Sequence, residues 1–426
     1  MSNRPSIIGR DLLPIIAVFA LSLVTRLYVV WAVPHNFSFD GYQRWAGREH
    51  ILVQDWLPAT QALIYAIESL GGDINDTRIV LAMIASLAAA MGAALAGACF
   101  GNRAAWWYLP FAVFYPFLTW STVPYQEGTY LLLLFSALVA FQHHRVVLAD
   151  LCIGALCLVR YEAWAIAVLW LMIRRDPKAI IAMWGILIWT VIRVGFDGVG
   201  HAASPIDFAD WNGLLERTSP RIALTTLTKL GHQLLNSAGW SALLMGGIGG
   251  LWALKSGTLV TRFIVVTVMI QVAAIFGWML GLETAIERMQ VIVVMTIGVL
   301  ATHPLVHMSK KTRWIGIACG VAAVWVSMNS ISYSVYAAKR SVNYVKPEMD
   351  LAAEMIQCGP TCRWSISPRD GLGTRSRHDG CEVIQGVTEY RHGHDFICET
   401  WAHPSGFQST HTAVWSRGKY LIRHRL

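Results

Sequence analysis

The sequence predicts an all-α polytopic membrane protein, and three observations support this fold class. Only 14% of the 426 residues are charged, whereas a soluble domain carries roughly 25%. Hydrophobic residues make up 55% of the chain. They occur in continuous runs of about 20 residues, the length that crosses a bilayer as a helix, and they do not alternate as barrel strands do.

The first apolar run, residues 12–33, predicts a membrane helix. It contains Arg26 and has no small-residue cleavage site, so we do not expect a removable signal peptide. Basic residues then fall at alternate helix ends, the positive-inside pattern with the N-terminus in the cytoplasm. They are Arg4, Arg10, Arg103, the run 143–145, Arg174, Arg175, Lys178, Lys255, Arg262, Lys310, Lys311 and Arg313.

Later apolar runs bring the expected number to about eleven transmembrane helices. The stretch 146–173 is assigned to two short helices, because one crossing would put Arg174, Arg175 and every later basic cluster outside. The ten further helices are expected near 78–101, 106–121, 128–142, 146–159, 161–173, 179–195, 238–254, 259–281, 286–304 and 313–336.

Two segments between helices are expected outside the cytoplasm, at 34–77 and 196–237. The second has an amphipathic portion around Leu224 to Leu235. The first predicts a helix lying flat at the membrane surface, with Asp55 as N-cap and glycines 71–72 as the stop. Its apolar stripe is formed by Trp56, Leu63, Ile67 and Leu70.

The polar tail predicts a small extracytoplasmic domain at 337–426, separate from a transmembrane module at 1–336. Its four cysteines favour two disulfides with three possible pairings, and zinc with nearby histidines is the competing interpretation. The residues concerned are Cys358, Cys362, Cys381 and Cys398, with His378, His392 and His394.

Ionisable groups at the outer ends of the helices are the candidates for chemistry, because such groups are costly at membrane depth. Asp40 lies beside Phe39 and Tyr42, where desolvation suits a general base; alternatively it caps the next segment. Glu127 follows the polar link 121–126. It suits binding of sugar hydroxyls, or it is simply an anion at a helix N-terminus.

Two arginines complete the candidates. Arg160 either pairs with Glu162 or holds a phosphate by paired hydrogen bonds. Arg288 lies near the start of a helix, where an anion meets both its guanidinium and free backbone amides; alternatively it pairs with Glu283 or Glu287.

In order and topology these features resemble the GT-C superfamily of integral-membrane glycosyltransferases. The resemblance covers roughly residues 1–305. It includes Asp40 in Ser-Phe-Asp-Gly-Tyr, the helix at 56–70, Glu127, Arg160-Tyr161-Glu162 and Glu287-Arg288-Met289.

The resemblance implies an inverting transfer of a sugar from a polyprenyl-phosphate donor to a lipid, glycan or protein acceptor outside the cytoplasm. Asp40 would be the base, and Arg160 and Arg288 would hold the lipid phosphate. Gly41 stands where many relatives have a second acid, so a metal is not favoured and no cofactor is expected. The expected substrate-binding residues are Tyr42, Gln126, Glu127, Tyr161, Glu162 and Glu287.

Other function classes fit the sequence less well. The net charge of +8 fits cytoplasmic loops and an anionic ligand, so nucleic acid is not an expected partner. No nucleotide-binding loop, His-Glu-x-x-His or Gly-x-Ser-x-Gly motif occurs. The alternatives are a transporter or flippase for a lipid-linked solute, which needs polar groups through the membrane's depth, and a lipid-linked glycan ligase or polymerase. A bacterial inner membrane is the expected location.

Overall fold

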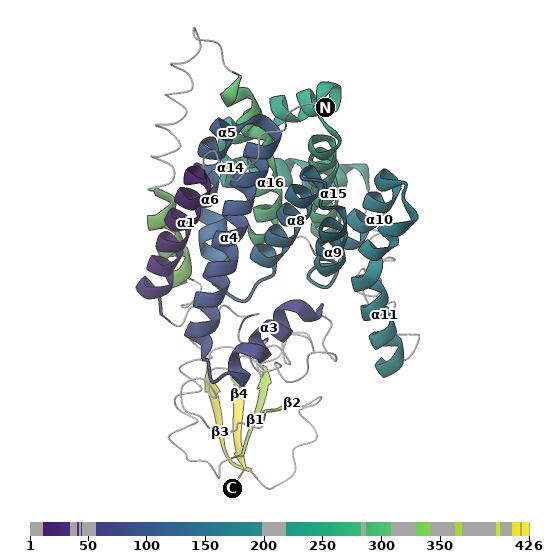
Figure 1. The fold of residues 1–426 in the computed structure, drawn as a ribbon. Coiled ribbons are helices and arrows are strands. Elements are labelled where there is room, and N and C mark those ends of the chain that lie inside the picture. The colour runs from purple at the N-terminus through teal and green to yellow at the C-terminus, as the bar shows by residue number, and fades with distance from the viewer. Residues whose placement is uncertain are drawn as a thin grey trace.

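A computed structural model describes residues 12–34, 41, 44, 57–197, 219–282, 287–307, 329–340, 363–368, 398–400, 411–417 and 420–425. These residues form a bundle of helices and, from the tail, a four-stranded sheet beyond one end of the bundle (Figure 1). The predicted helical membrane part is confirmed, and the sheet was not predicted.

The first two long helices, α1 (Leu13–Ala32) and α4 (Ile74–Phe100), pack side by side (Figure 1). Helix α4 begins earlier than the expected residue 78 because Asp73 and Asp76 form a capping box. The Asp73 side chain accepts from the amides of Asn75 at 2.7 Å and Asp76 at 2.9 Å. These contacts satisfy backbone N–H groups that have no partner within the helix.

The prediction of one helix at 106–121 is wrong. The structure has three short helices instead, α5 (Asn102–Trp107), α6 (Leu109–Ala112) and α7 (Tyr115–Trp120). Proline has no N–H and clashes with the preceding turn, so it fits best in the first turn of a helix. Pro110 and Pro116 each occupy that first turn, in α6 and α7.

Two buried arginines hold these short helices against α1 and α4. Arg26 of α1 donates from Nε to Ser121 Oγ at 2.8 Å and from an Nη to the Ala112 carbonyl at 3.1 Å. Arg78 of α4 donates to the Thr122 carbonyl at 3.2 Å. Each guanidinium thus lies at carbonyl-rich helix ends, where the helix dipole favours a cation.

The two short helices expected within 146–173 are confirmed. Helix α8 (Glu127–Gln142) is followed by α9 (Val146–Leu156) and α10 (Glu162–Arg174), and the chain turns between α9 and α10 at residues 157–161. The next expected helix begins as a 3-10 helix, η2 (Pro177–Met183), and continues as α11 (Trp184–Asp197).

Helix α14 (Pro220–Ser256) joins the amphipathic portion and the helix that were expected separately. The two halves meet at Gly239, whose φ of 76° and ψ of 155° are not helical. The second half packs so closely on α16 that a Cβ at Gly249 would overlap the Leu300 carbonyl oxygen. Small residues commonly allow such close helix packing in membranes.

The last part of the bundle contains α15 (Leu259–Leu282), the 3-10 helix η4 (Glu287–Met289) and α16 (Gln290–Val306). A further helix covers 329–340, and residues 313–328 of the expected last helix lie outside the described residues. This helix packs on the C-terminal end of α1, where Ala338 contacts Val29 and Val33.

Four helices in the described part of the chain are long and apolar enough to cross a membrane. They are α1, α4, α14 and Leu259–Gly277 of α15. Shorter apolar helices are Glu127–Gln142, Val146–Leu156, Pro177–Ile192 and Gln290–Val306. The number of eleven crossings therefore stays a prediction.

The expected surface helix is present as α3 (Pro58–Ser69). It ends as predicted at Gly71, whose φ of +85° suits glycine. The predicted stripe is not the face that packs on the protein, because Ile64 and Gln61 are buried there whereas Leu70 is 89% exposed. The prediction of Asp55 as N-cap is wrong, because the helix begins at Pro58 with Leu57 at the N-cap position. Trp56 lies outside the described residues.

The tail contributes β1 (Arg363–Pro368), β2 (Cys398–Thr400), β3 (His411–Arg417) and β4 (Tyr420–Arg425), in the order β2-β1-β4-β3. Strand β1 is parallel to β2 and antiparallel to β4. The sheet lies at the same end of the bundle as α3 (Figure 1). Cys358, Cys362, Cys381 and the tail histidines named above lie outside the described residues, so the separate domain and the disulfides stay predictions.

Candidate active site

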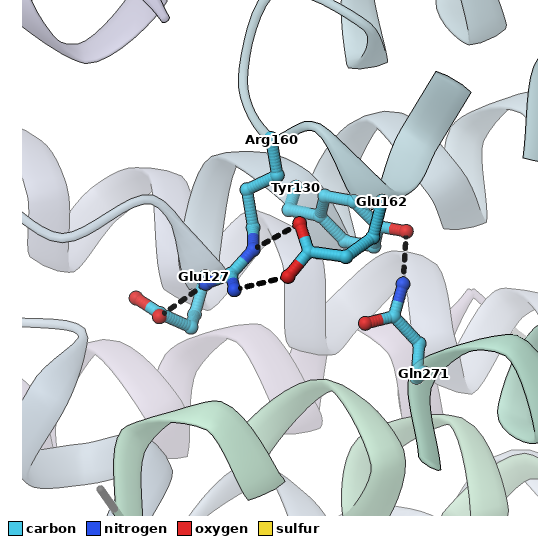
Figure 2. Close-up of polar contacts among 5 residues, drawn as sticks. All are labelled: Glu127, Tyr130, Arg160, Glu162 and Gln271. Atoms are coloured by element: carbon cyan, nitrogen blue, oxygen red, sulfur yellow. Dashed lines mark hydrogen bonds and ion pairs between the residues drawn. The ribbon is translucent and has the colours of Figure 1, made fainter. Parts of the chain in front are cut away.

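Three charged side chains from separate elements meet at one end of the bundle. Arg160, in the turn between α9 and α10, donates to Glu127 Oε1 at 2.8 Å and to both oxygens of Glu162 at 2.6 and 3.2 Å. Glu127 is the first residue of α8 and Glu162 the first of α10. Figure 2 shows the guanidinium between the two carboxylates.

This cluster is largely removed from water. The side chains of Glu127, Arg160 and Glu162 are 2%, 11% and 23% exposed. Burial lowers the pKa of the Arg160 guanidinium, but the charges of Glu162 and Glu127 outweigh burial and raise it above its usual value. Arg160 is therefore a permanent cation that orients two carboxylates.

Glu127 keeps an unused acceptor. Its Oε2 is buried and has no hydrogen-bond partner among the described residues, whereas Oε1 accepts from Arg160. A buried carboxylate oxygen without a donor is costly, so such atoms are usually satisfied. A hydroxyl or amine of a bound ligand would supply the missing donor.

A second polar contact lies beside the cluster (Figure 2). Gln271 of α15 donates to the hydroxyl of Tyr130 at 2.6 Å, and Tyr130 is one helical turn after Glu127 in α8. Both side chains are buried. Sequence reasoning missed this pair, although a glutamine within the apolar run 259–281 was a signal for it.

Arg288 lies near the same cluster. Its guanidinium carbon is 4.2 Å from the centre of the Tyr125 ring, and Tyr125 is buried two residues before Glu127. The charge of Arg288 is also among those that favour the Glu162 carboxylate. The cluster thus contains two guanidinium groups and two carboxylates.

The remaining expected site residues divide into two groups. Gln126 and Tyr161 are half-buried beside Glu127 and Glu162, and the Tyr161 ring packs on Trp164 at 5.4 Å. Asp40 and Tyr42 lie outside the described residues, as does the side chain of Glu287. Their predicted roles are not tested by the structure.

Helix α3 contacts the turn that carries Arg160. The Ala59 amide, in the first turn of α3, donates to the Leu158 carbonyl at 3.2 Å. The cluster therefore lies near the end of the bundle that α3 covers. Within the described ranges no three side chains of His, Cys, Asp or Glu gather as metal ligands would.

Comparison with known proteins shows similarity in fold. No protein-family model and no curated protein sequence matches the chain. The structure is similar to ArnT from Cupriavidus metallidurans bound to undecaprenyl phosphate, with 11% identity and a TM-score of 0.60 over 97% of this chain and 98% of that chain. The apo state of ArnT gives 12% identity and the same TM-score and coverage.

The structure is also similar to the Archaeoglobus fulgidus oligosaccharyltransferase in its apo form. The identity is 14% and the TM-score 0.51, over 84% of this chain and 59% of that chain. The long apolar helices and these membrane-protein neighbours identify the chain as an integral membrane protein, as predicted.

Proposed function

Because this chain has the GT-C fold, we propose that it is a membrane glycosyltransferase. It transfers a sugar from a polyprenyl-phosphate donor to a lipid, glycan or protein acceptor on the extracytoplasmic side. The observation that carries this proposal is the buried cluster of Glu127, Arg160 and Glu162 with Arg288 beside it, at the end of the bundle next to α3. ArnT, which shares the fold, was crystallised with undecaprenyl phosphate.

In this proposal Asp40 is the general base. The acceptor hydroxyl attacks the anomeric carbon of the donor sugar while the Asp40 carboxylate takes its proton, and the bond from that carbon to the lipid phosphate breaks. A single displacement inverts the anomeric carbon and needs no covalent enzyme intermediate. The lipid tail stays in the bilayer while the phosphate and sugar enter the site.

The leaving phosphate gains negative charge as the bond breaks, so fixed cations stabilise the transition state more than the ground state. Arg288 and Arg160 are the proposed phosphate-binding residues. Arg160 already donates to two carboxylates, and Arg288 supplies a second guanidinium beside the same cluster. Arg160 adds its remaining N–H groups and holds the two glutamates in place.

The sugar is bound beside these cations in the proposed scheme. Glu127 Oε2, which has no donor among the described residues, accepts from a sugar hydroxyl, and Glu162 contributes a second acceptor. The other proposed contacts are Tyr42, Gln126, Tyr161 and Glu287. A metal is not favoured in the proposed reaction, because the two guanidinium groups supply positive charge.

A transfer assay tests this function. Purified full-length protein is incubated with a panel of polyprenyl-phosphate sugars and candidate acceptors, beside the variants Asp40→Asn and Asp55→Asn. We expect sugar transfer or donor hydrolysis by the wild type, and a loss of at least about a hundredfold in Asp40→Asn. Asp55→Asn changes another acid of the same segment and should keep its activity.

Two results would contradict the proposal. Full activity in Asp40→Asn would remove Asp40 from the mechanism. No turnover of any donor, with folded protein, would favour a transporter or flippase, and transport of a labelled lipid-linked sugar across vesicles would then be measured.

A further inference from the structure

The first half of α14 extends beyond the membrane core. With 37 residues at about 1.5 Å each, α14 is about 55 Å long, whereas the hydrocarbon layer is about 30 Å thick. Gly239 breaks the helical geometry, and Trp240, directly after it, is 76% exposed. Exposed tryptophans are typical of the membrane–water interface, which favours a position at or above the headgroups for residues 220–238.

This half-helix has three faces of different character. Leu230 is buried against Ile275 of α15 and Val293 of α16, which attaches the half-helix to both helices. Leu224 and Leu227 form an apolar face and are 66% and 55% exposed. An exposed apolar face at the headgroup level suits contact with acyl or polyprenyl chains.

The third face is polar and lines a groove. The groove has a volume of about 410 Å³ and is lined by Thr225, Thr228, Lys229, His232 and Gln233. Among these described lining residues there is no carboxylate. The Lys229 ammonium and the His232 imidazole N–H are donors that suit a phosphate, whereas the Thr225 and Thr228 hydroxyls donate to the Arg221 and Leu224 carbonyls of their own helix.

The groove is connected to the candidate active site by hydrogen bonds. Gln290, the first residue of α16, donates to Gln233 Oε1 at 3.2 Å and contacts the Ser237 hydroxyl. Arg288 is two residues before Gln290. Lys229 is one helical turn before Gln233 in α14, and it takes part in none of the ion pairs among the described residues.

We propose that the groove on α14 binds the phosphate of a polyprenyl-phosphate lipid, with the lipid chain along Leu224 and Leu227. Lys229 and His232 hold the phosphate, and Arg288 receives it next along the path to the cluster. The identity of the lipid rests on the proposed function. The existence of an anionic headgroup site rests on the groove itself.

Binding of undecaprenyl phosphate to the purified full-length protein tests the proposal without catalysis. Native mass spectrometry or a fluorescence titration would compare the wild type with Lys229→Gln/His232→Gln. Affinity should fall at least about tenfold, the usual loss when charge-assisted hydrogen bonds to an anion are removed. Lys255→Gln is the matched control, since Lys255 is an exposed lysine at the other end of α14.

Three results would overturn the proposal. These are unchanged affinity in the double variant, equal binding of the neutral alcohol undecaprenol, and equal competition by phosphatidylglycerol. Because the assay measures binding, it tests the groove separately from the proposed function. If the enzyme is active but its lipid affinity does not depend on Lys229 and His232, the proposed function stands and the groove proposal is wrong. If binding depends on Lys229 and His232 but no donor is turned over, the groove proposal stands and the proposed function is wrong.

Discussion

Replacing Arg160 with glutamine removes the guanidinium that both Glu127 and Glu162 contact. Removing one partner of a buried ion pair costs about 3–5 kcal/mol, because the other charge is left buried and uncompensated. Glu127 is 2% exposed, whereas Glu162 is 23% exposed and better solvated. We therefore expect the lower end of that range, about 3 kcal/mol of unfolding free energy.

Thermal unfolding in detergent, followed by tryptophan fluorescence at one scan rate, measures this loss. For a chain of this size 1 kcal/mol corresponds to about 2 °C or less, so the apparent Tm should fall by about 4–6 °C. Arg160→Gln combined with Glu127→Gln removes one of the two uncompensated charges and should recover at least half of the loss. Arg145→Gln, an exposed arginine in the α8–α9 turn, should leave the Tm unchanged.

The reasoning fails if Arg160→Gln unfolds at the wild-type temperature, because the three charges would then be solvated. It also fails if adding Glu127→Gln lowers the Tm further. That result would mean that Glu127 contributes through contacts other than its charge, since coupled residues in one network deviate from additivity.

Three more predictions concern the packing of the bundle, each read out as an apparent Tm. Gly249→Ala should lose about 1–3 kcal/mol because the added methyl overlaps α16, whereas Gly247→Ala, with open space around it, should lose nothing. Tyr130→Phe should cost about 0.5–2 kcal/mol, since it leaves buried Gln271 without its acceptor; an unchanged Tm would contradict that bond. Arg26→Leu should destabilise more than Arg26→Lys, which keeps the charge at the helix ends.

The helices that the sequence predicted well are the long apolar runs with clear ends. The helix at 12–33, the pair within 146–173 and the helix at 259–281 are close to α1, α9 with α10, and α15. Hydrophobic length and the positive-inside pattern decide such elements locally, without knowledge of tertiary contacts.

The features that were missed depend on local breaks or on distant partners. Pro110 and Pro116 divide an apolar run that hydropathy alone reads as continuous. The strands of the tail are short, and β3 and β4 carry no clean apolar alternation, so their pairing was not visible.

The sequence predicted which residues belong to the candidate site, but not which of them contact one another. Sequence position brought Glu127, Arg160 and Glu162 to the same end of the bundle. The sequence could not decide whether Arg160 pairs with Glu162 or binds a phosphate. The structure shows that Arg160 also donates to Glu127, which is 33 residues away in the sequence. The contact between Gln271 and Tyr130 spans 141 residues and has no local signature.

The position of Arg26 has a consequence for biogenesis. Its acceptors Ala112 and Ser121 follow it by 86 and 95 residues, so they have not yet been synthesised when α1 reaches the translocon. Until then only its own helix offers acceptors, such as the Ser22 carbonyl at 3.1 Å. A lone arginine at the centre of an inserting helix costs about 2.5–3.5 kcal/mol on translocon scales. The first helix therefore becomes fully compatible with lipid only after α6 and α7 emerge from the ribosome, which makes its release into the bilayer a step coupled to their arrival.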